Sequence, residues 1–112
     1  MHEMGITRNI VAIVSEHAGE RRVRRVTLEI GRLSAVMPDA IAFCFDVVAA
    51  GTACEGARLE IEEVPGRAEC RSCGRDVALD GPLSPCGACG SRLLRRTAGE
   101  ELKVKEMELE LG

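Results

Sequence analysis

The chain has 112 residues, of which 46% are hydrophobic and 29% charged, with a formal net charge of −3. This acidic balance argues against nucleic acid as the main partner, because phosphate binding requires a positive surface. No run of residues approaches the roughly 20 apolar positions that cross a bilayer, so we expect a cytoplasmic protein without membrane contact. Disulfides are rare in that compartment. The six cysteines therefore indicate metal ligands or buried thiols.

Residues 1–65 alternate between helical and extended patterns. Residues 6–18 place apolar side chains, among them Ile13, at helical spacing and predict an amphipathic helix close to the amino terminus. Alternation over 26–31 predicts a strand with one buried face, and Pro38 suits the first turn of a second helix. Alternation resumes at residues 59–62, which predicts a second strand.

The composition changes at residue 66. Over residues 66–97 glycine, proline and cysteine dominate and the periodicity fades, as is typical of a loop-rich metal module. Alternation returns over residues 102–111, and a lone strand there would not be stable. We therefore expect this strand to rejoin the first sheet. The predicted domains are residues 1–65 plus 98–112, and an inserted zinc ribbon over residues 66–97.

Two cysteine pairs dominate the inserted segment. Cys70 and Cys73 are followed, after twelve intervening residues, by Cys86 and Cys89, and a glycine follows each pair. Two such turns facing each other supply four sulfurs in a closed tetrahedron, which predicts one structural Zn²⁺ without an open position for catalysis. A redox dithiol would be a single pair, whereas iron fits the same four thiolates.

The amino terminus offers a second kind of metal site. The Met1 amine, the His2 amide nitrogen and the His2 imidazole can form fused chelate rings, and the Glu3 amide can complete a plane of four nitrogens. Square-planar nitrogen ligation suits Ni(II) or Cu(II). A histidine at position 2 is more often an end residue without a ligand role. The predicted helix, however, tethers this end of the chain.

Several short motifs follow one another along nearly the full length: Met1-His2-Glu3, Leu28-Glu29-Ile30-Gly31, Ala42-Phe43-Cys44-Phe45-Asp46, Gly51-Thr52, Glu55-Gly56 and the two cysteine pairs. In order and spacing they resemble the HypA/HybF family of hydrogenase-maturation nickel chaperones. The resemblance implies an α+β fold of two helices packed on a three-stranded sheet, with an inserted four-cysteine zinc-ribbon domain. It also implies delivery of Ni²⁺ to the precursor of the [NiFe]-hydrogenase large subunit, together with the GTPase HypB, and in some organisms a role with urease maturation proteins.

The same resemblance implies a nickel site at the amino terminus. His2 would be the principal ligand, with the Met1 amine and Glu3 close by. Some family members are thought to use an acidic side chain before the second helix. Ungapped alignment places Met37 at that position and Asp39 two residues beyond, so Asp39 is a candidate only through its proximity.

We therefore expect a metallochaperone with structural zinc, nickel as cargo and no enzymatic turnover, acting as a monomer or weak homodimer. One alternative is a zinc-ribbon module for nucleic acid, although the ribbon carries arginines without any aromatic side chain. The other is a zinc-ribbon adaptor without nickel cargo. His17, Cys44 and Cys54 are expected to have structural roles.

Overall fold

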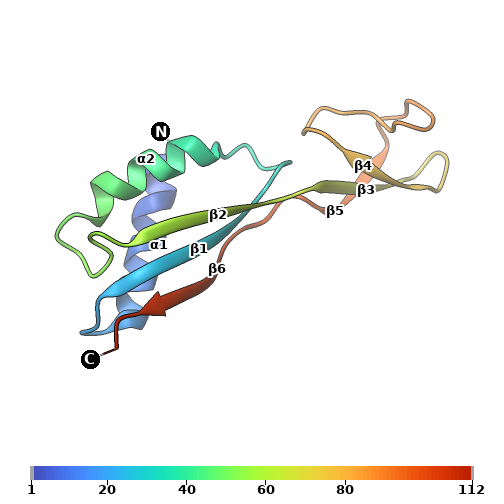
Figure 1. Ribbon diagram of the computed structural model, residues 1–112. Coiled ribbons are helices and arrows are strands. Elements are labelled where there is room, and N and C mark those ends of the chain that lie inside the picture. The colour runs from blue at the N-terminus through green and yellow to red at the C-terminus, as the bar shows by residue number, and fades with distance from the viewer. Residues whose placement is uncertain (1, 112) are drawn as a thin grey trace. The chain divides into compact units, whose positions relative to one another are not determined.

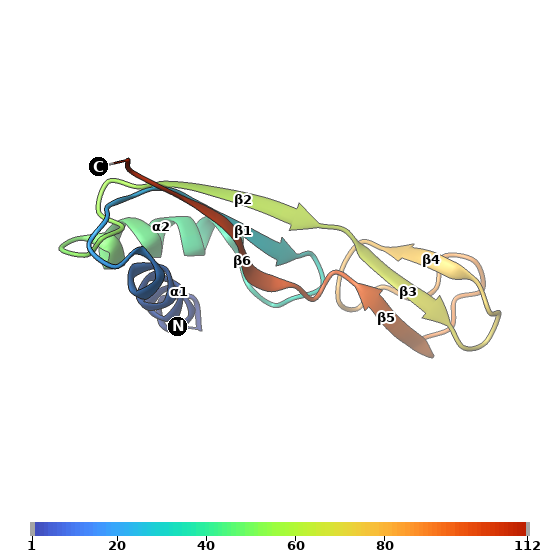
Figure 2. The same ribbon diagram turned by 90° about the horizontal axis from the view of Figure 1, so that it is seen from below.

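The computed structural model describes residues 2–111, and for His2 it describes only the backbone. The elements are α1 (His2–Ala18), β1 (Val23–Gly31), α2 (Pro38–Ala49), β2 (Arg58–Val64), β3 (Gly66–Cys70), β4 (Asp76–Leu79), β5 (Leu94–Ala98) and β6 (Leu102–Leu109). They form two three-stranded sheets, ordered β2-β1-β6 and β4-β3-β5 (Figure 1). The predicted α+β class is confirmed, and β6 joins the first sheet beside β1 as expected. Both helices lie on one face of that sheet (Figure 2).

Helix α1 begins at His2, four residues before the predicted start. Its buried side chains are Thr7, Ile10, Val11, Val14 and Ala18. Ile13 was predicted to share this apolar face, and that prediction is wrong, because its side chain is 50% exposed. At 3.6 residues per turn, position 13 lies roughly a third of a turn from the centre of the buried stripe.

Strand β1 is the central strand of its sheet. Val26, Leu28 and Ile30 are almost fully buried, as alternation predicts, but Thr27 between them is only 2% exposed. On the outer face, where acidic residues of both neighbouring strands gather, Arg25 forms ion pairs with Glu60 at 3.4 Å and Glu106 at 3.7 Å. The single buried face predicted for this strand is therefore wrong, because Thr27 on the outer face is buried as well.

Helix α2 packs through Ile41, Cys44, Phe45 and Ala49, with Pro38 in its first turn. Together with α1 and most of β1, β2 and β6 it belongs to a first compact unit of residues up to 28, 36–61 and from 104 onward. The second unit comprises residues 29–35 and 62–103. Its small core consists of Leu33, Ala68 and Leu79, with Val77 and Leu94 packed against them. The domain boundaries at residues 66 and 97 stay a prediction.

Three glycines, Gly31, Gly66 and Gly99, allow chain segments of the second unit to meet around Leu33. A Cβ atom at Gly31 would overlap the Gly99 carbonyl, and one at Gly66 would lie 2.6 Å from the Leu79 oxygen. Gly99 also has φ +105°, which disfavours other residues. The Leu33 N–H donates to the Gly99 oxygen at 2.7 Å, so the crossing is hydrogen bonded as well as tightly packed.

Within residues 2–111, no helix has both the length and the apolar character needed to cross a membrane.

Candidate metal sites

The two cysteine turns are built by the same backbone hydrogen bonds. Cys70 and Cys86 each donate their N–H to the carbonyl five residues further on, at 2.8 Å in both turns. Each also accepts, at 2.8 Å, from the glycine four residues further on, which is Gly74 or Gly90. These glycines have φ +76° and +77°, a conformation that other residues resist. The repeated sequence pattern is therefore a repeated structure.

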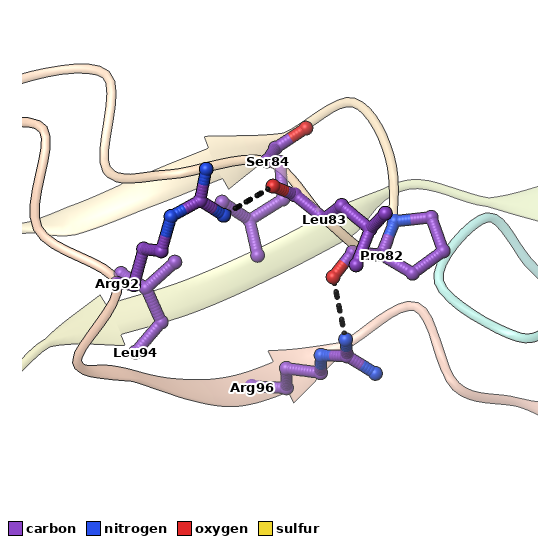
Figure 3. A pocket seen from close by; sticks show the side chains of 7 residues that line it. Pro82, Leu83, Ser84, Arg92, Leu94 and Arg96 are labelled. Carbon is purple, nitrogen blue, oxygen red and sulfur yellow. Dashed lines mark hydrogen bonds between the residues drawn. The ribbon is translucent and has the colours of Figure 1, made fainter.

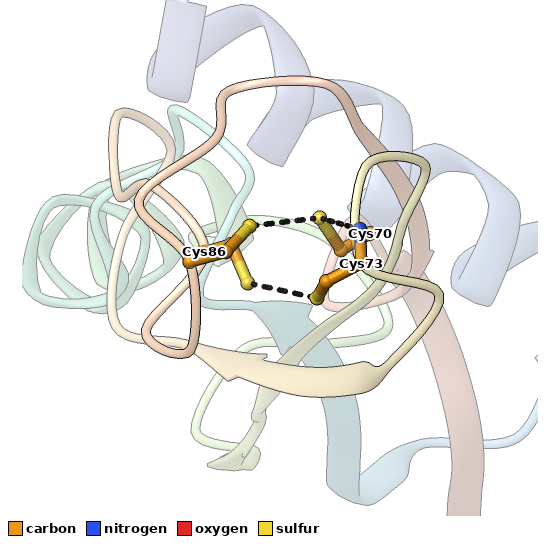
Figure 4. A group of neighbouring side chains, drawn as sticks. Cys70, Cys73 and Cys86 are labelled. Carbon is orange, nitrogen blue, oxygen red and sulfur yellow. Dashed lines mark hydrogen bonds between the residues drawn. The ribbon is translucent and has the colours of Figure 1, made fainter.

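The four thiols converge on one point. Their sulfur atoms all lie within 4.8 Å of one another. The Cys70 and Cys89 sulfurs are 3.6 Å apart and those of Cys73 and Cys86 are 3.8 Å apart. Figure 4 shows Cys86 facing Cys70 and Cys73 across the site. A tetrahedral ion with bonds of about 2.3 Å requires sulfur separations of about 3.8 Å. None of the cysteines is in a disulfide, so this predicted set fits a single tetrahedral metal ion.

Backbone N–H groups stabilise the thiolate form of two of these cysteines, which favours binding of a cation. The Cys73 amide donates to the Cys70 sulfur at 3.5 Å and lowers the pKa of Cys70 to about 6. The Cys89 amide likewise lowers the pKa of Cys86. The Ser91 amide acts to lower the pKa of Cys89, but the neighbouring Cys70 sulfur opposes it, and the net pKa is raised to about 11. Four sulfurs this close together oppose the loss of all four thiol protons, because the resulting negative charges repel one another. A bound dication would offset this repulsion.

A turn clamped by two arginines leads into the second cysteine pair. The Arg92 guanidinium donates to the Leu83 carbonyl at 3.0 Å, and Arg96 donates to the Pro82 carbonyl at 2.8 Å (Figure 3). The two side chains border a cavity of about 140 Å³ between the turn and the sheet. Both guanidinium groups thus hold the segment that delivers Cys86 to the metal site. The sequence did not reveal these clamps, because each spans residues far apart in the chain.

The amino-terminal candidate site is described only in part. Met1 lies outside the described residues, and so does the side chain of His2. Because α1 begins at His2, the amide groups of His2 and Glu3 are among the first four of the helix, which have no carbonyl acceptor within it. Their nitrogens therefore take no part in the hydrogen-bond ladder of α1.

Two contacts fix the first turn of α1. The buried Thr7 hydroxyl donates to the Glu3 carbonyl at 2.5 Å. The Glu3 carboxylate accepts from the Met37 N–H at 3.4 Å. The structure thus brings Glu3 to the residue that precedes α2. The spacing of Thr7, four residues after Glu3, could have predicted the first contact, because a threonine hydroxyl can donate to the carbonyl four residues earlier in a helix. Nothing in the sequence indicated the contact between Glu3 and Met37.

Asp39 lies in the first turn of α2 and is exposed. Among the side chains that the structure describes, its carboxylate forms no ion pair. His17 is exposed on α1. Cys44 and Cys54 are buried, and burial raises the pKa of the Cys54 thiol. Among the described residues, His17, Cys44 and Cys54 do not belong to the four-cysteine cluster, and the ligand role of Asp39 stays a prediction.

The fold and the four-cysteine site together define a small metal-binding α+β protein whose metal module is inserted before the last strand of the main sheet. The protein-family model described as "Hydrogenase/urease nickel incorporation, metallochaperone, hypA" matches residues 1–109. The chain therefore belongs to the HypA family, as its motif order indicated.

Relatives and solved structures agree with this membership. The chain is 60% identical to a hydrogenase maturation factor HypA from Nostoc sp., over 98% of this chain and 96% of that protein. It is 56% identical to a HypA from Geobacter metallireducens, over 98% of this chain and 100% of that protein. The solution structure of the Ni metallochaperone HypA from Helicobacter pylori has a TM-score of 0.67, 23% identity and 96% coverage of both chains, which supports the fold. A second HypA solution structure gives a TM-score of 0.69 and 26% identity, covering 98% of this chain and 97% of that one.

Proposed function

We propose that this chain binds Ni(II) at its amino terminus and delivers it for maturation of [NiFe]-hydrogenase, while the four cysteines hold a structural zinc ion. The observation that carries the nickel proposal is the start of α1 at His2. It leaves the amide nitrogens of His2 and Glu3 outside the helical ladder, at the positively polarised end of the helix dipole. Deprotonated amide nitrogens are negative, so this end of the helix favours them.

The nickel ligands in this proposal are the Met1 amine, the His2 amide nitrogen, the His2 imidazole and the Glu3 amide nitrogen. This set gives Ni(II) the planar nitrogen environment that it accepts readily. The Glu3 carboxylate, held by the Met37 N–H, adds negative charge beside the ion. Asp39 is kept as a candidate only through its nearness in sequence to Met37.

Delivery requires release as well as capture. A site at the end of the chain exchanges ligands more readily than a closed cage, and its imidazole competes with protons near a pKa of about 6.5. The protein in this proposal is a carrier and catalyses no reaction. Its partners are the HypB GTPase and the precursor of the hydrogenase large subunit, with urease maturation proteins as further recipients. Its cytoplasmic location stays a prediction.

The zinc assignment rests on the sulfur geometry. Zn²⁺ is commonly held by four cysteines in structural sites, and when bound here it would join the two cysteine turns. It supplies folding energy to a module whose core contains few buried side chains. We propose no transfer of this ion, because four protein ligands leave no open position.

The nucleic-acid alternative is disfavoured because three of the ribbon arginines are paired with acids. Arg67 lies 3.3 Å from Asp76, Arg95 lies 3.5 Å from Glu69, and Arg96 lies 3.2 Å from Glu100. Arginines neutralised in this way offer little to a phosphate backbone, which requires a concentrated positive field.

The test is a Ni(II) titration of the zinc-loaded chain without a tag, in the wild type, His2→Ala and His17→Ala. His17 is the matched control, because it is an exposed histidine on the same helix. We expect one-to-one binding in the wild type and His17→Ala, loss of binding in His2→Ala, and the same zinc content in all three proteins. Equal binding in His2→Ala would remove His2 from the site. Absence of nickel binding in the wild type would favour a zinc-stabilised adaptor.

A further inference from the structure

The two phenylalanines of the chain lie on opposite sides of α2. Phe45 is 1% exposed and belongs to the core, whereas Phe43 is 70% exposed. Val47, one helical turn further on, is 55% exposed. Residues four apart share one face of a helix, so Phe43 and Val47 form an apolar stripe on the outside of α2. Large exposed aromatic side chains are characteristic of interaction sites.

Acidic residues border this stripe. Asp39 precedes Phe43 by four positions and Asp46 follows it by three, which places both carboxylates on the same side of the helix. Both residues are exposed, and α2 contains no lysine, arginine or histidine. We call these four residues, Asp39, Phe43, Asp46 and Val47, the α2 face. Its chemistry is apolar in the centre and negative at the edge.

The α2 face adjoins the end of the chain proposed to hold nickel. Met37, immediately before α2, is 64% exposed and adds a flexible apolar side chain. Its N–H is the group that donates to the Glu3 carboxylate at 3.4 Å. A protein that covers the α2 face would therefore also reach the first turn of α1.

We propose that the α2 face is the docking surface for the protein that accepts the nickel ion, and that the accepting surface is apolar with lysine or arginine at its edge. This inference rests on the proposed function, since it names the surface through which cargo is handed over. Charge selects the partner: a basic rim complements Asp39 and Asp46, and such complementarity speeds encounter and fixes orientation. A symmetric pair of copies of this chain would instead set acid against acid across the two-fold axis. Anionic membranes and nucleic acids are disfavoured for the same reason.

The test uses the full zinc-loaded chain and, as the probe, purified nickel-free precursor of the hydrogenase large subunit. Phe43→Ser removes the apolar centre and Asp46→Lys reverses the charge. Ile13→Ser and Glu16→Lys are matched controls, because both residues are exposed on α1. Calorimetry gives the affinity for the precursor, a titration gives the Ni(II) affinity, and thermal unfolding checks the fold of each variant.

We expect Phe43→Ser and Asp46→Lys to weaken precursor binding about tenfold or more, as loss of a central contact commonly does. Their nickel affinity should be unchanged, and the control variants should bind the precursor like the wild type. Equal precursor binding in the wild type and all four variants would overturn the proposal. Absence of precursor binding by the wild type would overturn it as well. Wild-type dimers that Phe43→Ser dissociates in sedimentation would also overturn it, because the occupant would then be a second copy. Nickel binding by the wild type is a separate readout; its absence would refute the proposed function, and with it any handover at this face.

Discussion

Gly31 lies so close to the carbonyl of Gly99 that a side chain at position 31 would overlap backbone atoms. Gly31→Ala must therefore displace the crossing of segments around Leu33, and we expect a loss of about 3 kcal/mol of stability from this strain. Gly5→Ala is the control, since nothing lies within 4 Å of its would-be Cβ. An alanine inside α1 should stabilise by about 0.5–1 kcal/mol. Urea unfolding of both variants measures these changes in the free energy of unfolding. An unchanged midpoint for Gly31→Ala would contradict the packing around Leu33.

Thr27 provides a test of buried polarity. Its hydroxyl is a buried side-chain group that finds no hydrogen-bond partner within the described residues. Thr27→Val keeps the branched shape and removes the unpaired oxygen, so we expect a gain of about 1 kcal/mol. Thr52→Val should instead lose about 1 kcal/mol, because the Thr52 hydroxyl donates to the Ala49 carbonyl at 2.7 Å and accepts from the Cys54 N–H at 3.0 Å. Opposite shifts in the unfolding free energy would support this account, and equal shifts would refute it.

The arginine clamps predict a local effect in the zinc module. Arg96→Ala removes the hydrogen bond to the Pro82 carbonyl and the ion pair with Glu100. We expect faster amide exchange at Gly81, Leu83 and Ser84 and a loss of about 1 kcal/mol in stability. Arg75→Ala is the control, because its exposed side chain holds no part of this turn. Unchanged exchange in Arg96→Ala would show that Arg92 alone fixes the segment.

Acid should release the metal from the four cysteines within a definable window. The pKa of Cys70 is lowered to about 6 in the native turn, below the reference value of about 8.5 for an unfolded thiol. A lowered pKa contributes stability that is complete above the unfolded value and is lost as the pH falls through the folded one. Protons compete with zinc for all four thiolates, including Cys89, whose pKa is raised to about 11 when no metal is bound. We therefore expect zinc to stay bound at neutral pH and to be released only in acid, below the pKa of Cys70. A chromogenic chelator monitors the release, and half-release near pH 8 would contradict the amide-stabilised thiolate.

Local patterns predicted most of the elements, and long-range contacts account for what they missed. The cysteine spacing placed all four sulfurs of the metal site correctly, because a tight turn determines where its own side chains point. The strand of residues 26–31 was also recognised. The burial of Thr27 was missed because alternation assigns position 27 to the outer face, and only the assembled sheet, in which β1 lies between β2 and β6, determines how far that face is covered. The same limit applies to the Glu3–Met37 contact. The ligand role of His2 stays a prediction, because the structure describes only the backbone of this residue.

The matching hydrogen bonds of the two cysteine turns have a consequence for how the module is assembled and damaged. Each turn is complete within its own short stretch of chain, so either pair can capture an incoming ion before the other arrives, and loading can proceed in two steps. The sulfur distances also determine how the metal-free module would be oxidised. The close pairs join the two turns, Cys70 with Cys89 at 3.6 Å and Cys73 with Cys86 at 3.8 Å, so an oxidant that removes two electrons and two protons from such a pair would link the turns by a disulfide and eliminate the site. A reductant, followed by fresh metal, would then be needed to restore the module.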